Sequence, residues 1–520
     1  MQKLLTLNNL GVQGLNSDIR PWELPPEFIT EGRNFRASNA ALRASGGSLL
    51  WSTAPAFNPG FVMPVKTDAS DFWLVAGRSA IYVFDGANWT NISSVTGYAG
   101  IGADGELLWN GCKLGKIPIL NNELSTPEYW SPQQSSQVMQ PLDFSVGNTW
   151  DSLNYTCKVI RSHRNFLFAL NLNENGTDFS NSYRWSHPAD INGLPFTWDE
   201  TDQSALAGKA QIGGDSGRII DGLSLRDSFC IYSENATNIL DYRGDEFVWR
   251  RRELSSLFGL LSSNCVTEIK GTHFFIGDGD IVKNDGNKID SIIHNRLRRN
   301  LTSRMSVDAY DKSYVVQSPV DKEIWFCVPE DNATLPNVAY IYNWRDDSWS
   351  VRDLPEGIAH AGYGTQVQPS LLWDDWNTRW DDAESTWGSR KDSPLDETVV
   401  GVNSATGELI MLDPKGQSVE INTVVERTDL PLEGHNNVTT LTRVYPHIDG
   451  NTPMTFQFGS QDHAGSAIRW LPEQSFTPGT DRKLDLRTTG ELHCWRAKSQ
   501  GSGRFILSGM DFEYSMSGKR

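Results

Sequence analysis

The sequence predicts an all-β fold: a β-propeller built from repeated hairpins, followed by a C-terminal antiparallel β-sandwich. Three observations predict it. A hairpin-like segment recurs along the chain, short apolar segments are separated by glycine-centred turns, and the 520 residues include 45 glycines, 24 prolines and 19 tryptophans. Turn formers and aromatic-rich short strands are typical of all-β proteins. Because this length exceeds that of one compact core, we expect a large repeat-built domain and a smaller one.

Residues 1–32 are expected to form an extended N-terminal arm. They contain Pro21, Pro25 and Pro26, and proline-rich segments resist regular structure. Nowhere does the chain hold an apolar run of about 18 residues, so neither a signal peptide nor a membrane-spanning segment is expected.

The propeller is assigned to residues 33–416, because the hairpin "AIYVFDGANWTNIS" at 80–93 returns as "YIYNWRDDSWSVRDLP" at 340–355. Three positions of the first hairpin match three of the second: Ile81, Tyr82 and Trp89 correspond to Ile341, Tyr342 and Trp349. Looser versions follow as "FFIGDGDIVKNDG" and "VVGVNSATGELIMLD". Glycine at the turns is typical of hairpins, since it adopts positive φ at no steric cost.

Hairpins of this kind cannot bury both faces alone, but stacked around an axis they form the blades of a propeller. An aromatic side chain on an outer strand then packs on the next blade. Five residues are expected to provide this packing: Tyr82, Trp89, Tyr342, Trp344 and Trp349. The repeat is therefore interpreted as scaffold.

One helix is predicted after residue 289. Asp290 or Ser291 would cap it. Apolar residues then recur at every fourth position, which gives a single apolar stripe: Ile293, Leu297, Leu301 and Met305.

A regular alternation of apolar and polar residues begins near Gln417. It is clear in "TLTRVYPHI", "MTFQFGS" and "FILSGMDFEYS". Residues 417–520 are therefore predicted to form a separate antiparallel β-sandwich of about 100 residues, a common size for that architecture.

Two groups of arginines are candidate interface residues. One is Arg250, Arg251 and Arg252, in "WRRREL"; the other is Arg296, Arg298 and Arg299, in "HNRLRRN". A charge run is usually a solvated face. In a chain of net charge −18, pairing with an acidic neighbour is favoured over a grip on DNA. A negative wall would instead let DNA pass without binding.

No catalytic, metal or cofactor site is predicted. The six cysteines are scattered singly, which disfavours zinc. Four carboxylates lie among tryptophans, as a glycosidase site would need: Asp374, Asp375, Asp381 and Asp382. They fall within one short stretch, whereas propeller hydrolases assemble their sites from several blades, so a tryptophan-anchored surface loop is the preferred interpretation.

The order of several segments resembles that of a known family. "RNFLFALNLNENGTDFSNSYRWSHPADINGLPFTW" is followed by "GRIIDGLSLRDSFCIYSENATNILDY", "THFFIGDGDIVKNDG", "EIWFCVPE" and "IYNWRDDSWSVRDLP", and the chain closes with "GRFILSGMDFEYSMSGKR". This succession, from about residue 6 to the C-terminus, resembles the tail tubular protein B, or nozzle, family of short-tailed bacteriophages, in its compact version.

The resemblance implies a non-enzymatic structural virion protein at the distal part of the tail. Six copies would form a ring below the adaptor ring that links to the portal, and the genome would leave through that ring. The implied partners are the chain itself, the adaptor ring and passing double-stranded DNA, with tail fibres as a further candidate. The arginine groups would then lie at subunit seams or face the adaptor.

One other function stays open at this point, and a second is disfavoured by the sequence. A propeller-fold tail protein could degrade or bind host surface glycans, which requires carboxylates from several blades to converge on one pocket. A kelch-like adaptor is the third interpretation, but it requires a Gly-Gly doublet before each hairpin. Only Gly46-Gly47 and Gly213-Gly214 occur, and neither directly precedes a tryptophan-bearing hairpin.

Overall fold

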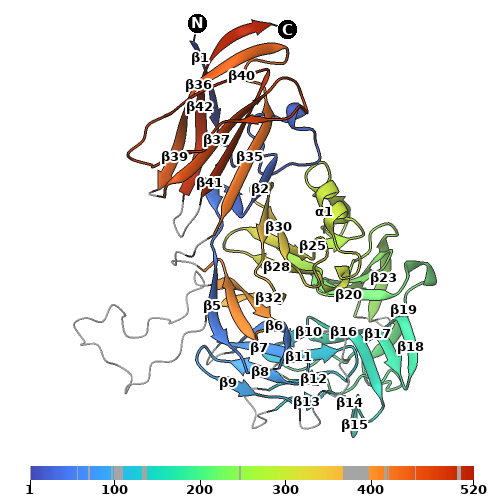
Figure 1. Cartoon of the computed structure of the whole chain (residues 1–520). Helices are drawn as coiled ribbons and strands as arrows, with labels where there is room; N and C mark the ends of the chain where they lie inside the picture. The colour runs from blue at the N-terminus through green and yellow to red at the C-terminus, as the bar shows by residue number, and fades with distance from the viewer. Residues whose placement is uncertain are drawn as a thin grey trace, which may run out of the picture.

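The computed structural model describes residues 2–55, 57–67, 71–94, 98, 109–131, 138–191, 193–244, 248–366, 397–414, 419, 421–450, 452–499 and 505–519. Within these residues, seven four-stranded antiparallel sheets and two six-stranded sheets make up nearly all the regular structure. The predicted all-β fold is confirmed: a propeller forms one part of the molecule and a sandwich the other (Figure 1).

Each four-stranded sheet is one blade, numbered here in chain order. Blade 1 holds β6 (Pro59–Lys66), β7 (Asp71–Gly77), β8 (Ile81–Phe84) and β9 (Trp89–Asn91). Blade 2 holds β10 (Trp109–Leu114), β11 (Ile117–Asn122), β12 (Glu128–Tyr129) and β13 (Gln140–Pro141). Blade 3 holds β16 (Tyr155–His163), β17 (Phe166–Glu174), β18 (Thr177–Trp185) and β19 (Gly208–Gln211). A hairpin of β14 (Asp143–Ser145) and β15 (Asn148–Thr149) lies between blades 2 and 3 in the sequence.

Blade 4 holds β20 (Ile219–Leu225), β21 (Ser228–Ser233), β22 (Thr237–Tyr242) and β23 (Trp249–Ser255). Blade 5 holds β24 (Val266–Ile269), β25 (Thr272–Gly277), β26 (Asp280–Asn284) and β27 (Ile289–Ser291). Blade 6 holds β28 (Tyr314–Ser318), β29 (Glu323–Val328), β30 (Val338–Asn343) and β31 (Ser348–Asp353). Short 3-10 turns occur at Pro21–Glu23, Gly214–Ser216 and Tyr310–Lys312.

Blade 7 is completed from the N-terminal part of the chain. It holds β32 (Ile358–Thr365), β33 (Glu397–Asn403) and β34 (Glu408–Leu412), and its fourth strand is β5 (Ser48–Thr53). The first strands of successive blades contact one another in order, and β32 returns to contact β6. The ring of blades is therefore closed by a strand that comes from far away in the sequence.

The sandwich also draws on both ends of the chain. One sheet runs β3 (Phe35–Ser38), β4 (Ala41–Ala44), β42 (Phe505–Lys519), β36 (Asn437–Gly450) and β40 (Leu484–Gly490), with β1 (Gln2–Asn8) paired to β42. The other runs β2 (Glu31–Arg33), β35 (Thr423–Leu430), β41 (Leu492–Ser499), β37 (Met454–Gln461) and β38 (Arg469–Trp470), with β39 (Gln474–Phe476) on β37. Buried apolar residues of both sheets belong to one core.

The domain boundaries differ from those expected. Residues 1–32 are not an extended arm, because β1 and β2 are strands of the sandwich. Residues 33–44 also belong to the sandwich, so the propeller begins at β5 rather than at residue 33. The physical reason is burial: Leu7, Leu10 and Ile29 are each at most 2% exposed and complete a core that the C-terminal residues do not fill alone.

The helix is shorter than predicted. Helix α1 spans Arg298–Arg304, and the expected cap residues Asp290 and Ser291 lie in β27 instead. The residue before α1 provides no side-chain cap. Asp18 provides it from the N-terminal segment, where its carboxylate accepts hydrogen bonds from the N–H groups of Arg298 and Arg299 at 2.8 and 2.9 Å. No described helix is long and apolar enough to cross a membrane.

Candidate functional sites

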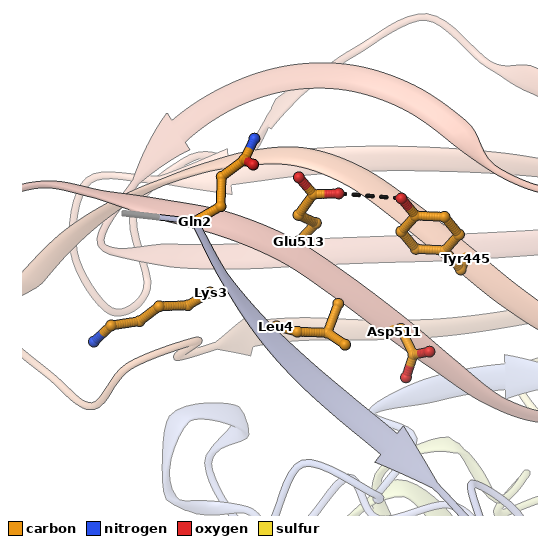
Figure 2. Close-up of a pocket in the computed structure, with 6 residues that line it drawn as sticks. All are labelled: Gln2, Lys3, Leu4, Tyr445, Asp511 and Glu513. Atoms are coloured by element: carbon orange, nitrogen blue, oxygen red, sulfur yellow. Dashed lines mark hydrogen bonds between the residues drawn. The ribbon is translucent and has the colours of Figure 1, made fainter.

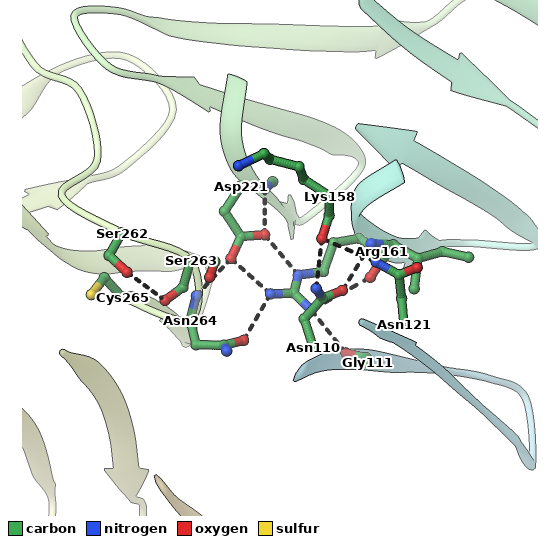
Figure 3. Close-up of polar contacts among 12 residues, drawn as sticks. Asn110, Gly111, Asn121, Lys158, Arg161, Asp221, Ser262, Ser263, Asn264 and Cys265 are labelled. Atoms are coloured by element: carbon green, nitrogen blue, oxygen red, sulfur yellow. Dashed lines mark hydrogen bonds and ion pairs between the residues drawn. The ribbon is translucent and has the colours of Figure 1, made fainter. Parts of the chain in front are cut away.

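The centre of the propeller holds a buried ion pair (Figure 3). Arg161 on β16 donates from Nε and Nη2 to the two carboxylate oxygens of Asp221 on β20, at 2.8 and 2.7 Å. The backbone N–H groups of Gly222 and Asn264 donate to the same carboxylate at 2.7 and 2.9 Å. Asp221 is 0% exposed. Both of its oxygens are therefore occupied, and this carboxylate is held as a structural group rather than as an acid or a base.

Hydrogen bonds of this network cross the propeller axis. Asn264, which leads into blade 5, donates from Nδ2 to the carbonyl of Trp109 in blade 2 at 3.1 Å. Its side-chain oxygen accepts from Arg161 of blade 3 at 3.0 Å. Blade 5 adjoins neither blade 2 nor blade 3, so these bonds span the centre of the ring. At this level the axis is filled with side chains and is not an open passage.

Aromatic rings from the remaining blades complete this central packing. The ring of His360 on β32 lies between Phe61 on β6 and Tyr314 on β28, with centroid distances of 4.6 and 5.0 Å. This centre was not predicted from the sequence. The sequence feature that indicates it is the presence of polar residues within otherwise apolar strands, such as Asn110 and Asp221.

A second set of ion pairs fixes the sandwich to the propeller. Arg36 on β3 bonds to Glu323 on β29 at 2.8 Å and to Asp413 at the end of β34. Burial would lower the pKa of Arg36, but Asp413, Glu323 and Asp321 raise it above its ordinary value. Arg36 therefore stays charged inside the junction.

The N-terminal segment extends this junction along blade 6. The N–H of Leu15 donates to the carbonyl of Trp349 at 2.9 Å, and Asn34 exchanges hydrogen bonds with the backbone of Val351 and Asp353 at 2.8 and 2.9 Å. Arg33 on β2 reaches Glu330 at 3.2 Å. The two modules are thus joined by backbone hydrogen bonds and ion pairs, and not by a single linker.

Four of the five predicted packing aromatics lie at contacts between blades or beside the N-terminal segment. Trp89 donates from Nε1 to Ser52 on β5 at 3.0 Å, which joins blade 1 to blade 7. Tyr342 lies 6.1 Å from Phe274 of blade 5, measured between ring centroids. Trp344 stacks under Lys270, which follows β24, at 4.5 Å. Trp349, 1% exposed, pairs with Gly14 of the N-terminal segment. Tyr82 packs within blade 1 on Trp89.

The two predicted arginine groups have different surroundings. Arg296 donates to the carbonyl of Gln13 at 3.1 Å, and Arg298 donates to the carbonyl of Gly279 at 3.0 Å. With the backbone of Arg299 bound to Asp18, this group holds the N-terminal segment in place. The other group, Arg250–Arg252, is exposed on β23, the outermost strand of blade 4.

A cavity of about 450 Å³ lies on the sandwich beside β1 (Figure 2). Six residues line it: Gln2, Lys3, Leu4, Tyr445, Asp511 and Glu513. The hydroxyl of Tyr445 donates to Glu513 at 3.1 Å. The cavity therefore combines two carboxylates, an aromatic ring and an exposed leucine.

The metal and glycosidase hypotheses have different outcomes, because the described residues bear on the first of them alone. They contain no group of three or more His, Cys, Asp or Glu side chains that could hold a metal ion. All six cysteines are buried and free, and burial raises the pKa of each thiol, to about 12 for Cys112 and Cys327. The four carboxylates of the glycosidase hypothesis, Asp374, Asp375, Asp381 and Asp382, lie outside the described residues.

No family model matches this sequence, and no curated protein matches it. Solved structures with a similar arrangement include the WD40 domain of Neurospora crassa Pan2, at 10% identity over 72% of this chain and 96% of that chain, with a TM-score of 0.36. An exo-β-1,3-galactanase from Phanerochaete chrysosporium is similar at 9% identity over 90% of this chain and 100% of that chain, with a TM-score of 0.26. At these values, neither similarity indicates an activity or a partner.

Proposed function

We propose that this chain is a structural virion protein, the subunit of a tail nozzle ring through which phage DNA is ejected into the host. In this role it docks below the adaptor ring of the portal, at the distal part of the tail, and no covalent chemistry is assigned to it. The proposal starts from the order of sequence segments that resembles the nozzle family.

The joined propeller and sandwich are the observation that carries the proposal. A ring that withstands the passage of a genome needs rigid subunits, and identical subunits close a ring through head-to-tail contacts. The ion pairs of Arg33 and Arg36, together with the N-terminal segment on blade 6, hold the two modules as one block.

The filled propeller axis also bears on where DNA would pass. Since the Arg161–Asp221 network closes that axis, the channel in this proposal lies between subunits, around the axis of the ring. A net charge of −18 per subunit suits a wall that repels phosphate and lets DNA slide.

The test is the mass of the full-length protein in solution, alone and with purified adaptor ring, by light scattering, followed by electron microscopy of the particles. Six copies in a ring, formed alone or on the adaptor, are expected. A monomer that ignores the adaptor would contradict the proposal. Cleavage assays on host surface polysaccharide would then become the next measurement, because the glycan alternative predicts activity in a monomer.

A further inference from the structure

The cavity beside β1 lies on the outward face of its sheet. Along β42, Met510 and Phe512 are at most 1% exposed and face the core. Successive side chains of a strand point to opposite faces, so Asp511 and Glu513 face outward. In the pairing of β1 with β42, Leu4 lies opposite Glu513. The cavity is therefore part of the surface of the sandwich and not of its interior.

The carboxylates of this cavity are only partly neutralised. His447 contacts Asp511 Oδ2 at 3.1 Å, and Asp511 Oδ1 is buried without a hydrogen-bond partner among the described residues. Arg443 reaches Glu513 at 3.4 Å and is shared with Asp485, to which it is closer at 2.9 Å. The ammonium of Lys3 is paired with Glu433 and not with either cavity carboxylate. The cavity thus keeps one buried carboxylate oxygen without a partner, and the second carboxylate shares its cationic partner with Asp485.

The chemistry of the lining fits the side chain of arginine. A guanidinium binds carboxylates through a fork of N–H groups and stacks on aromatic faces, and its aliphatic stem packs on apolar surface. Asp511 and Glu513 provide the carboxylates and Tyr445 the ring. Leu4, 59% exposed, provides the apolar surface.

The same chain displays a matching row of arginines, Arg250–Arg252, here called the arginine row. Arg252 is paired with Asp241 at 3.1 Å. Arg250 and Arg251 are exposed and make no ion pair or side-chain hydrogen bond with the described residues. Uncompensated arginines on the outer edge of a blade, in a chain of net charge −18, are complementary to the carboxylates of the cavity.

The two patches lie on different modules. Figure 1 places β1 at the far end of the sandwich, near both termini, and β23 on the rim of the propeller. One copy cannot bring its own rigid patches together, but two copies can. Each copy then keeps one free patch of each kind, which is the requirement for a head-to-tail ring.

We propose that the cavity beside β1 binds the arginine row of a second copy of this chain, and that this contact is the seam of the assembly. The inference rests on the proposed ring in that it names the surfaces that close it. Its occupant is Arg250 or Arg251 of the neighbouring copy, held by Asp511 and Glu513.

Paired charge reversals test the seam. The variant R250E/R251E and the variant D511K/E513K are each expected to weaken self-association at least tenfold. Mixed together, they are expected to assemble again in alternation, because an intact cavity then meets an intact arginine row and the reversed row meets the reversed cavity, so that every seam joins opposite charges. Matched controls carry the same charge changes at exposed sites elsewhere, R218E/K288E and D227K/D308K, and are expected to assemble like the wild type.

Chemical cross-linking keeps the test decisive if the wild type is a monomer. Since all six native cysteines are buried, the double variant R251C/E513C should give a ladder of multimers with a short bismaleimide, and each single variant should give dimers at most. A ladder without a ring would support the seam and contradict the nozzle. Rings that persist in each charge-reversal variant on its own would overturn the seam, and so would a double variant that gives no ladder. Loss of adaptor binding in R250E/R251E, with self-association unchanged, would assign the arginine row to the adaptor.

Discussion

The carboxylate of Asp221 accepts four hydrogen bonds at the centre of the propeller. We expect Asp221→Asn to lower the free energy of unfolding by about 3–5 kcal/mol, because it leaves the buried guanidinium of Arg161 without a counter-charge. Calorimetry of the full chain measures this as a lower unfolding temperature. The control is Asp227→Asn, whose side chain is 94% exposed; equal melting of the two variants would contradict a structural role for the ion pair.

Asp18 offers a milder residue-scale test. Its carboxylate caps α1 across a long sequence separation, so Asp18→Ala is expected to cost about 1 kcal/mol, the usual worth of an N-cap. Hydrogen exchange should show the amides of Arg298 and Arg299 losing protection while the sandwich amides keep theirs. Unchanged protection at these two amides would show that the cap contributes nothing.

At the scale of elements, the N-terminal strands decide whether the rest of the chain folds. Deleting residues 1–32 removes β1, all of β2 except Arg33, and the buried Leu7, Leu10 and Ile29. Each buried aliphatic side chain stabilises by roughly 1.5–3 kcal/mol. We expect the truncated chain to lose the cooperative unfolding of its sandwich. If residues 1–32 were instead an arm lying on a domain that is complete without them, the deletion would leave the unfolding transition unchanged. Circular dichroism during heating distinguishes these two outcomes.

The hairpins were predictable because alternation and glycine turns act over a few residues. Trp89 and Tyr342 could accordingly be recognised from the sequence as residues that pack between blades. The assignment of residues 1–44 could not be predicted, since "KLLTLN" has the same pattern whether its strand pairs locally or with β42 at the other end of the chain. The central network could not be predicted for a related reason. Arg161, Asp221 and Asn264 come from three different blades, and only the closed ring brings them together.

For the whole molecule, the sandwich and the propeller are both completed by the same N-terminal 53 residues. These residues supply β1–β4 to the sandwich and β5 to the propeller. Arg36 joins the two modules at the point where the chain passes between them. We therefore infer that the modules unfold in a coupled manner, and conditions that destabilise either one should affect the stability of the other.

Acid is such a condition, because three buried histidines are held neutral. Burial lowers the pKa of His163, His273 and His493 from 6.5 to about 4. Between about pH 6.5 and 4 the unfolded chain binds protons that the native state does not, so the free energy of unfolding falls as the pH falls, on the order of 1–3 kcal/mol per histidine. Melting temperatures recorded across this range should decrease steadily. His493→Gln should make the melting temperature depend less on pH, whereas the same substitution at the exposed His463 should leave the pH dependence unchanged. A wild-type melting temperature that does not change with pH over this range would contradict the burial of neutral histidines.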